Sequence, residues 1–396
     1  MKVMLCHNFY QQSGGEDQVF ADEKRMLSSN GHEVATFTRH NDNVSDVSRI
    51  RLAAGTIWNK KACVELERDI RRFDADVVHF HNTMPLLSPA AFRAAWKAGV
   101  AVVLTLHNYR LMCPKGTFHR NGKVCQDCLG RTPWPAIKHA CYRDSVAASS
   151  VLATMMATHR TMGTYHNYID AFISLCNFAR QKHVDAGFPG EKIFLKPNFF
   201  QGDPAVGEGD GKYFMFLGRL SSEKGLNVLL DSWVHQELKI PLKIVGRGPM
   251  EDDVRAAMKR NRHISLVGNA ERDDVVSYLS NAMALILPST NFEGFPKTIV
   301  ESFAVGTPVI ASKLGAMEEL VSAGRTGFHF TAGDSLDLSK VVSELAAHPD
   351  KLQEMRPNAR DEFVQHYTEE VNHRRLMEIY GAAIEGRKQA GGADVQ

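Results

Sequence analysis

The sequence predicts an α/β protein built from two Rossmann-like domains, each a doubly wound parallel sheet with helices on both faces. Its length of 396 residues fits two or three domains, and 44% hydrophobic residues can fill two cores. Short apolar runs alternate with helical segments in both halves, which is the pattern of parallel sheets. Between the halves, residues 197–211 are rich in glycine and lack apolar periodicity, so we expect a linker there. The predicted domains are residues 1–196 and 212–365, followed by a C-terminal helix and polar tail in residues 366–396.

The first predicted domain begins with a strand at residues 3–6 and a turn that leads into an amphipathic helix. Ser13 and Glu16 have the spacing of a capping box, which would place Gly14 and Gly15 in the first helical turn. Amides at a helix N-terminus are free and glycine has no Cβ, so a diphosphate could approach the backbone closely there. Further strands are expected at residues 34–38, 77–80, 100–106, 171–174 and 192–195.

Histidines follow two of these strands. His79 and His81 lie at the end of the strand at residues 77–80, and His107 follows the strand at residues 100–106. Ligands of open α/β sheets bind outside the carboxyl ends of the strands, so both positions suit a substrate contact. We interpret His79 as structural, because an isolated histidine usually is.

Residues 107–145 form an insertion that contains four of the seven cysteines. Cys113, Cys125, Cys128 and Cys141 have the spacing C-x11-C-x2-C-x12-C, and four thiolates with one C-x2-C pair suit a tetrahedral structural zinc. The alternatives are four ordinary thiols or an iron–sulfur centre. Residues 107–143 also carry seven Lys and Arg against one Asp. This charge implies an anionic partner, whether a phosphate, a polyanionic glycan or a membrane surface.

The second predicted domain opens with a strand at residues 213–217 that runs into a turn with two cations. Arg219 and Lys224 lie five residues apart before a helix N-terminus. Together they can hold a diphosphate, because the guanidinium is a planar fork and the ammonium is a point charge. The strand at residues 264–267 also ends in a turn, which contains Gly268 and Asn269.

Residues 288–312 are the most informative stretch of the chain. They predict a loop, a helix and a strand, with Pro296 at the first helical position, where its fixed φ and missing N–H cost nothing. Glu293 precedes the helix, and Glu301 lies about 7–8 Å along its axis. The amides at the helix N-terminus therefore lie between two carboxylates, which suits a phosphate flanked by two polyols.

The stretch from Glu293 to Glu301 resembles the E-x7-E signature of family 4 retaining glycosyltransferases of the GT-B fold. The resemblance implies two Rossmann-like domains facing across a cleft, with the C-terminal helix crossing back to the first domain. It implies that Glu293 contacts the donor sugar and Glu301 the nucleotide ribose. The amides of Gly294 and Phe295 would reach sugar and phosphate oxygens.

Two other segments of the second domain resemble the same family. Arg219 and Lys224 match the segment whose Arg and Lys bind the nucleotide diphosphate. Gly268 and Asn269 follow the strand where the family holds the nucleobase through backbone groups.

In the first domain the resemblance implies contacts on the donor side. Gly14 and Gly15 occupy the place of the glycine-rich first loop, and His107 matches the histidine that contacts the donor sugar. The acceptor-side candidates are Glu16, His81, Lys115 and Arg120.

We therefore expect a retaining glycosyltransferase that moves a hexose from a UDP- or GDP-sugar to a glycan or lipid-linked acceptor in cell-surface polysaccharide synthesis. The catalytic candidates are His107, Glu293, Arg219 and Lys224. No Asp-x-Asp metal motif follows a strand, so the two cations and helix amides must offset the diphosphate charge without a catalytic metal or other cofactor.

Two other functions compete with this expectation. A sugar-nucleotide epimerase or hydrolase on the same fold would need acid–base carboxylates in the first domain, where Glu16 and Asp17 are the early candidates. A zinc-stapled nucleic-acid-binding protein would explain the basic insertion. Against it, no predicted helix carries a basic stripe interleaved with aromatic residues, so no nucleic-acid partner is expected.

The sequence also bears on compartment. The apolar run at residues 1–6 is too short for a signal peptide, and no uncharged stretch approaches the roughly 20 apolar residues of a membrane span. Seven cysteines in a chain of this length do not make a disulfide scaffold. We expect a cytoplasmic protein with peripheral contact to the inner face of the cytoplasmic membrane.

Overall fold

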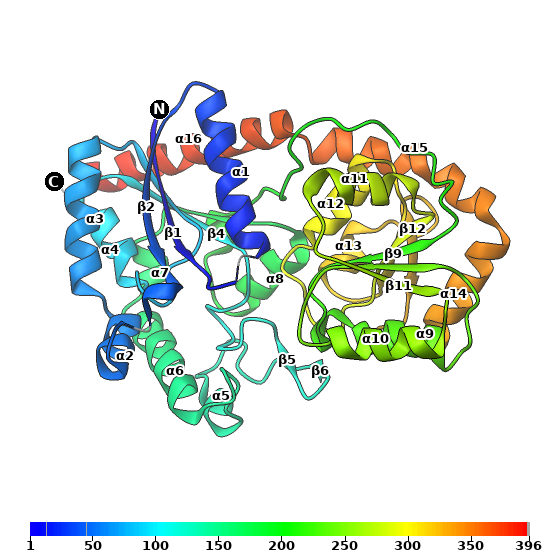
Figure 1. The fold of residues 1–396 in the computed structure, drawn as a ribbon. Coiled ribbons are helices and arrows are strands. Elements are labelled where there is room, and N and C mark those ends of the chain that lie inside the picture. The colour runs from blue at the N-terminus through cyan, green and yellow to red at the C-terminus, as the bar shows by residue number, and fades with distance from the viewer. Residues whose placement is uncertain (13, 45, 394–396) are drawn as a thin grey trace. The chain divides into compact units, whose positions relative to one another are not determined.

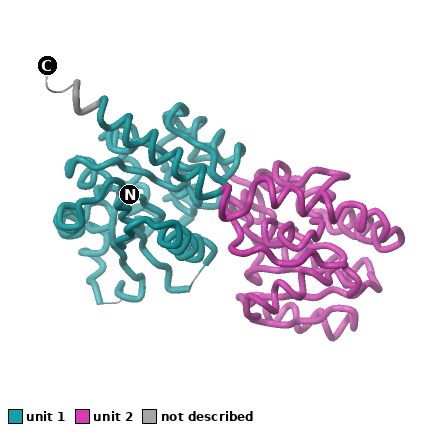
Figure 2. The backbone as a smooth tube through the Cα atoms, turned by 90° about the horizontal axis from the view of Figure 1, so that it is seen from above, with its two compact units in different colours: residues 1–117, 126–197, 372–396 teal, residues 118–125, 198–371 magenta. Residues whose placement is uncertain are grey.

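The computed structural model describes residues 1–12, 14–44 and 46–393. Figure 1 shows the elements, and Figure 2 shows the two compact units into which the chain divides. The first unit comprises residues 1–117, 126–197 and 372–396, and the second comprises residues 118–125 and 198–371. Residues 118–125 come from the middle of the predicted insertion, yet they group with the second unit, where the ring of Phe118 lies 6.2 Å from that of Phe292.

The first unit contains a six-stranded parallel sheet in the order β2-β1-β3-β4-β7-β8. Its strands are β1 (Lys2–Phe9), β2 (Glu33–His40), β3 (Val77–Phe80), β4 (Ala101–Leu106), β7 (Ala171–Ser174) and β8 (Ile193–Leu195). Val3 of β1 lies opposite Val34 of β2 on one side and Val77 of β3 on the other. The strand β2 lies on one side of β1, and β3 and the later strands lie on the other side. The sheet is therefore doubly wound, with its switch point between β1 and β3.

Helices enclose this sheet. They are α1 (Gly15–Ser29), α2 (Arg49–Ile57), α3 (Lys60–Phe73), α4 (Ala90–Lys97), α5 (Trp134–Lys138), α6 (Val146–Thr161), α7 (Thr164–Asn167), α8 (Asn177–Asp185) and α16 (Glu369–Ala393), with 3-10 turns η1 (Asn41–Val44) and η2 (Gly190–Lys192). From Asn372 onward α16 belongs to the first unit, although it follows the second unit in sequence. It is anchored there by Arg387, whose guanidinium lies 4.0 Å from the ring centroid of Trp96.

The second unit repeats the architecture with the order β11-β10-β9-β12-β13-β14. Its strands are β9 (Phe214–Leu217), β10 (Leu242–Val245), β11 (Ile264–Gly268), β12 (Ala284–Leu287), β13 (Val309–Ser312) and β14 (Gly327–Phe330), all parallel. The short antiparallel hairpin β5 (His119–Arg120) and β6 (Lys123–Val124) also lies in this unit. The switch point of the six-stranded sheet is between β9 and β12.

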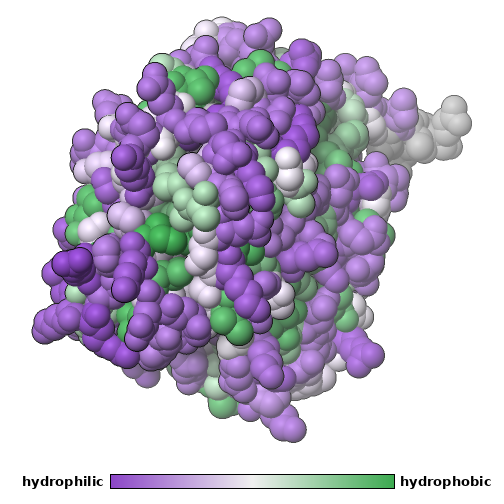
Figure 3. Space-filling model, turned by 90° about the vertical axis from the view of Figure 1, so that its right-hand side faces the viewer, coloured by the Kyte–Doolittle hydropathy of each residue, from purple (hydrophilic) through white to green (hydrophobic). Residues whose placement is uncertain are grey.

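The helices of the second unit bury a large apolar core against this sheet. They are η3 (Ser222–Lys224), α9 (Leu226–Val234), α10 (Glu251–Arg260), α11 (Arg272–Asn281), α12 (Lys297–Ala304), α13 (Ala316–Leu320), α14 (Ser335–Ala347) and α15 (Pro349–His366). Trp233 is fully buried in the core, and its indole N–H is satisfied by the carbonyl of Ile240 at 2.7 Å. On the face shown in Figure 3, hydrophobic residues form small separate patches among hydrophilic ones.

Two predicted helix starts are displaced by one residue. Helix α1 begins at Gly15 with Gly14 as the N-cap, and the side chain of Asp17, not Glu16, accepts a hydrogen bond from the Gly14 amide at 3.0 Å. Ser13, the predicted cap, lies outside the described residues. Helix α12 begins at Lys297, and Pro296 is its N-cap with extended backbone. Among the described residues, no helix has the length and apolar character of a membrane span.

Candidate active site

In the second unit, two loops meet at the carboxyl ends of β9 and β12, which is the switch point of the sheet. The amide of Thr290 donates a hydrogen bond to the carbonyl of Glu223 at 3.0 Å and so ties the loops together. Gly225 has φ +72°, and a Cβ there would lie 1.7 Å from the carbonyl oxygen of Pro288. Only glycine permits both the left-handed backbone and this close approach.

These loops pair Lys224 with Glu293. The Lys224 ammonium lies 2.8 Å and 2.9 Å from the two carboxylate oxygens, and the Ser289 hydroxyl donates to one of them at 2.7 Å. The Lys224 side chain is 34% exposed and that of Glu293 12% exposed. The sequence predicted that Lys224 contacts the diphosphate and that Glu293 contacts the donor sugar. The structure places these two side chains in direct contact.

Arg219 extends this cluster into solvent. It is an exposed residue of the same loop, and its charge acts on Glu223. Burial would raise the pKa of Glu223, but hydrogen bonds from the Ser221 hydroxyl and its own amide, with the charges of Arg219 and Lys224, hold it below its usual value. The sequence analysis did not single out Glu223, although it lies directly beside Lys224 in the chain.

The remaining donor-side candidates of the second unit lie around this cluster. Gly294 and Phe295 lead directly into α12, where Glu301 is half-buried about 6 Å along the axis from Lys297. Gly268 ends β11, two strands away from β9, and its carbonyl accepts from the amide of Gly246 at 2.7 Å. Asn269 is exposed just beyond it.

In the first unit, polar side chains gather at the carboxyl ends of β1, β3 and β4. His7 of β1 is fully buried, and its Nε2 lies 2.7 Å from Asp17 Oδ1. The other carboxylate oxygen, Oδ2, accepts a hydrogen bond from the Gly14 amide. Gly14 and Gly15 are themselves exposed at the start of α1. A cavity of about 330 Å³ lies beside this end of β1 and is lined by Phe9, Tyr10, Gln11, Asp17, Gln18, Ala21 and His40.

Glu16 is the acceptor-side candidate with the most distinctive environment. One carboxylate oxygen accepts hydrogen bonds from the Tyr10 hydroxyl at 3.0 Å and from the side-chain amide of Asn108 at 3.2 Å. The other oxygen is buried without a hydrogen-bond partner. Burial raises the pKa of Glu16, although the charges of His7 and Arg110 oppose the rise. Such a carboxyl can hold a proton or accept one from a substrate hydroxyl.

The histidines divide into a structural one and a connected pair. His79 is fully buried, and its ring nitrogens lie 2.8 Å from the Tyr380 hydroxyl and 2.7 Å from the Thr105 hydroxyl. His81 Nδ1 lies 2.9 Å from His107 Nε2. His107 is half-buried just beyond the end of β4. The structure therefore joins an acceptor-side candidate to the predicted donor-sugar contact.

Two buried charges beneath these histidines were missed by the sequence analysis. Glu23 and Lys196 are both fully buried, and the ammonium lies 2.6 Å from a Glu23 carboxylate oxygen. Glu23 is on the apolar face of α1, between the buried Phe20 and Met26. This pattern of a carboxylate at an inward helical position was visible in the sequence, but its partner, Lys196, is 173 residues away.

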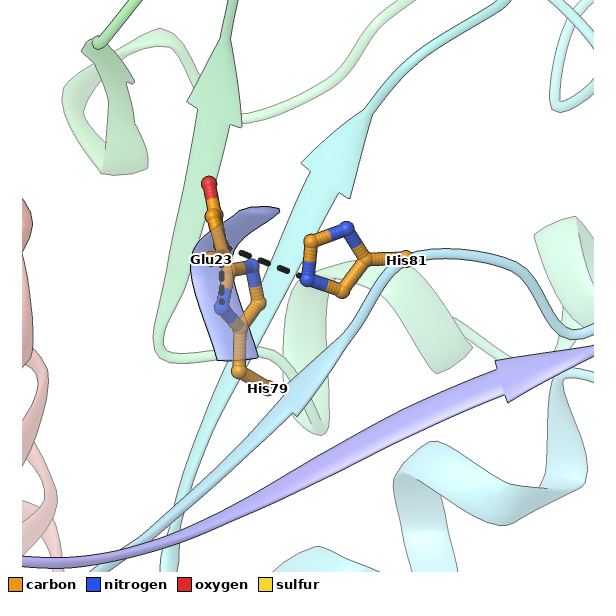
Figure 4. Close-up of side chains that lie close together, drawn as sticks. All are labelled: Glu23, His79 and His81. Atoms are coloured by element: carbon orange, nitrogen blue, oxygen red, sulfur yellow. Dashed lines mark ion pairs between the residues drawn. The ribbon is translucent and has the colours of Figure 1, made fainter. Parts of the chain in front are cut away.

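Glu23, His79 and His81 converge closely enough to raise the question of a metal ion (Figure 4). Their ligand atoms lie within 4.8 Å of one another. However, the Lys196 ammonium already supplies the positive charge beside Glu23, and both nitrogens of His79 are used by hydroxyl groups. The chemistry of this set fits a buried ion-pair network and not a metal site.

The predicted insertion is divided between the units. Lys115 is exposed in the first unit, and Arg120 lies in the β5–β6 hairpin of the second. Cys113, Cys128 and Cys141 belong to the first unit and Cys125 to the second. The zinc site stays a prediction from sequence, which elemental analysis of protein purified without added metal can test.

Two doubly wound parallel sheets, each with charged residues at its switch point, define the class of two-domain Rossmann-like proteins. A family model described as Glycosyltransferase Family 4 matches residues 13–201, and one described as Glycosyl transferases group 1 matches residues 203–362. The chain therefore belongs to the family 4 glycosyltransferases of the GT-B fold.

Individual proteins agree with this assignment. The chain is 32% identical over 174 residues to a phosphatidyl-myo-inositol mannosyltransferase of Mycobacterium leprae, a match that covers 43% of this chain and 46% of that relative. The chain spans less than half the length of the curated relatives that it matches first.

Solved structures match over nearly the whole chain. Sucrose-phosphate synthase of Thermosynechococcus elongatus has a TM-score of 0.71 at 16% identity, covering 99% of this chain and all of that one. Anabaena HepE in complex with UDP-glucose has a TM-score of 0.67 at 15% identity, covering 96% and 99%. At these identities, the likeness establishes the fold.

Proposed function

We propose that the protein is a retaining glycosyltransferase that moves a hexose from a UDP- or GDP-sugar to a glycan or lipid-linked acceptor in cell-surface polysaccharide synthesis. The observation that carries this proposal is the Lys224–Glu293 pair at the switch point of the second unit. Two similar proteins support the substrate class: one is named a phosphatidyl-myo-inositol mannosyltransferase, and the other was solved in complex with UDP-glucose.

In this proposal the second unit binds the donor. Lys224 and Arg219 offset the diphosphate charge without a metal ion, and the amides of Gly294 and Phe295 add further donors at the start of α12. Lys224 has three N–H donors, and its partial exposure leaves some of them for a phosphate while Glu293 is bound.

The same unit would hold the two sugars and the base of the donor. Glu293 is kept in orientation by Ser289 and can accept hydrogen bonds from hexose hydroxyls. Glu301 is proposed to hold the ribose, and backbone groups of Gly268 and Asn269 the nucleobase.

The first unit would supply His107 to the donor sugar and the glycine turn at Gly14 and Gly15 to the donor phosphates. The acceptor side is assigned to Glu16, Lys115 and Arg120, and His81, which is buried beside His107, would act on the substrate through that histidine. Retention without a protein nucleophile requires that the acceptor attack the face from which the diphosphate leaves, so that the leaving phosphate takes the acceptor proton. The protein then contributes position and electrostatics.

The localisation proposed with this function is the cytoplasm, with peripheral contact to the membrane that holds a lipid-linked acceptor. Trp134 of α5 is 68% exposed, and Val146 at the start of α6 is 57% exposed. Both lie in a stretch that also contains Arg131, Lys138 and Arg143. Exposed aromatic and apolar groups among cations suit an anionic membrane surface.

One observation favours a second candidate, a sugar-nucleotide epimerase or hydrolase. Glu16 has a raised pKa and one carboxylate oxygen without a partner, which suits acid–base chemistry on a sugar. An epimerase returns a nucleotide sugar with altered configuration, and a hydrolase releases free sugar when no acceptor is present.

A two-stage experiment tests the proposal. Thermal-shift screening against UDP, GDP, ADP and their sugars identifies the donor, and the hit is then incubated with lipid and glycan acceptors in the presence of EDTA. Transfer that survives EDTA supports a metal-independent transferase. Stabilisation by no nucleotide at all would contradict the proposed donor site.

A further inference from the structure

A chain of buried polar groups runs beneath His107 in the first unit. It begins at Lys196, whose ammonium lies 2.6 Å from Glu23 Oε1 and 2.9 Å from Asn372 Oδ1. All three side chains are fully buried. An isolated buried charge would be strongly disfavoured, so the ammonium and the carboxylate must remain paired.

Glu23 is ionised in this setting. Burial by itself would raise the pKa of the carboxyl, but Lys196 and the two histidines His81 and His79 hold it well below its usual value. An ionised carboxylate can only accept hydrogen bonds. Whatever faces its second oxygen, Oε2, is therefore required to present a proton.

Two ring nitrogens face Oε2. His79 Nδ1 lies 3.5 Å from it but is also 2.8 Å from the Tyr380 hydroxyl, and the nearer group is His81. Its Nε2 lies 3.3 Å from Glu23 Oε2, as the dashed line in Figure 4 marks. Both atoms are buried, and neither makes a hydrogen bond of standard geometry, so each is the other's nearest polar partner. A lone pair on Nε2 would face the carboxylate at close range, so the proton of His81 belongs on Nε2. Burial keeps the pKa of His81 below its usual value, which makes the ring neutral and leaves a lone pair on Nδ1.

His81 in turn determines the state of His107. Its Nδ1 lies 2.9 Å from His107 Nε2, and the rings are stacked at an interplanar angle of 21°. One of these two nitrogens must donate, and His81 Nδ1 has no proton. Nε2 of His107 is therefore the donor. Since burial and His81 hold the pKa of His107 well below its usual value, the ring is neutral and Nδ1 carries the lone pair.

We propose that Glu23 and His81 are positioning residues that fix His107 in its Nε2–H tautomer, so that Nδ1 accepts a hydrogen bond from a hydroxyl of the sugar substrate. The substrate part of this inference rests on the proposed function, whereas the tautomer part does not. The hydrogen bond made by one ring nitrogen of a histidine decides whether the proton lies on that nitrogen or on the other. In the same way, a second group fixes the tautomer and the ring orientation of histidines that bind metals.

Glu23→Gln is the sharpest test, because the structure dictates how the new amide must turn. Lys196 can only donate, so the amide oxygen has to face the ammonium at the position of Oε1. The NH2 group then replaces Oε2 and donates to His81 Nε2, which moves the His81 proton to Nδ1. His107 Nε2 becomes the acceptor, and its proton moves to Nδ1. The variant should thus invert both tautomers with almost no change in shape.

The measurement is long-range ¹H–¹⁵N NMR of protein labelled at histidine, with the His107 signals assigned by their loss in His107→Gln. Wild-type His107 should show a protonated Nε2 and a bare Nδ1, and Glu23→Gln should show the reverse. Tyr380→Phe is the matched control. It removes a buried hydrogen bond to His79, whose Nδ1 also lies 3.5 Å from Glu23 Oε2, but it leaves the Glu23 carboxylate in place. His81 must still present a proton to that carboxylate, so His107 should keep its wild-type tautomer.

Activity supplies the second readout. Glu23→Gln should lower kcat/KM for transfer by about tenfold, the scale of one lost hydrogen bond to substrate, while UDP or GDP affinity changes by less than twofold. A wild-type His107 protonated at Nδ1 overturns the proposal, even if the variant fails to fold. Inversion in Tyr380→Phe also overturns it. A tautomer that inverts in Glu23→Gln without loss of transfer overturns the substrate role. If the wild type transfers no sugar, the proposed function has failed, and the NMR result still decides the tautomer.

Discussion

The two units share one architecture but treat charge in opposite ways. In the first unit, Lys196 and Glu23 form an ion pair that is fully buried and continues into two histidines. In the second, Lys224 and Glu293 form an ion pair at a loop junction, with the ammonium 34% exposed. The ion pair of the first unit is closed off by burial, whereas the partly exposed ammonium of Lys224 leaves room for the anion that the proposed function requires.

Removing the buried cation should have the largest effect on stability. Lys196→Met leaves the Glu23 carboxylate buried without a counter-ion, and we expect a loss of about 3–5 kcal/mol in the free energy of unfolding. Urea unfolding measures this loss. Adding Glu23→Gln to the same chain removes the orphaned charge, and the double variant should regain most of the stability. A single variant as stable as the wild type would show that the network is not an ion pair.

Removing the exposed cation should affect activity and leave stability nearly unchanged. Lys224→Ala should reduce transfer more than tenfold, because a charge-assisted contact to the diphosphate is lost. The unfolding free energy should change by less than about 1 kcal/mol, as is usual for partly exposed ion pairs. Arg219→Ala should behave in the same way. If the two variants kept activity at the wild-type level and EDTA abolished it, a metal ion would hold the role proposed for Lys224 and Arg219.

Acid should weaken the first unit before the second. Burial is the main cause that lowers the pKa of six described histidines in the first unit, namely His32, His79, His81, His107, His159 and His183. In the second unit, the described histidine with a lowered pKa is His329. Below the unfolded value of 6.5, the unfolded chain binds protons that the folded first unit does not, so stability falls as the pH decreases from 6.5.

Hydrogen exchange followed by mass spectrometry, corrected for intrinsic rates, can measure this difference region by region. Between pH 7 and pH 5, peptides of β1, β3 and β4 should lose protection relative to those of β9, β10 and β12. Glu23 adds to the loss only below its unfolded value of 4.5, because its pKa is lowered as well. Equal loss of protection in both units would contradict the asymmetry.

A smaller and more selective effect separates the two carboxylates of the second unit. Glu301→Ala should weaken UDP or GDP binding by removing an acceptor for the ribose, by about 1–2 kcal/mol. Glu293→Ala should instead reduce transfer and leave nucleotide affinity nearly intact. Titration calorimetry beside a transfer assay distinguishes them, and equal losses in both measurements would mean that the two roles are not separable.

Much of the fold could be predicted from local sequence. Buried parallel strands are short apolar runs, and those at residues 77–80 and 171–174 coincide with β3 and β7. The predicted helix starts were displaced by one residue because more than one side chain can satisfy the amides at a helix start. Asp17 and Glu16 are both acidic residues close to Gly14 in sequence, and the backbone path decides which of them accepts from the Gly14 amide.

The positions of the candidate site residues could be predicted where these residues are neighbours in sequence and not where they are distant. Arg219 and Lys224 belong to one loop that a motif identifies. The pairing of Lys224 with Glu293 could not be predicted in this way, because the contact spans 69 residues and depends on the close approach of two loops at Gly225. The Glu23–Lys196 pair spans 173 residues, and no local pattern specifies it.

The central claim is retaining transfer from a nucleotide sugar, and the anomeric configuration of the first product tests it most directly. Time-resolved ¹H NMR during turnover of the donor identified by thermal shift, with the acceptor that supports transfer, follows the anomeric proton before it can equilibrate. A retaining enzyme yields a glycoside with the anomeric configuration of the donor, together with free UDP or GDP, and this is the expected result. A glycoside of opposite configuration, or a nucleotide sugar returned with an altered hexose, would contradict it.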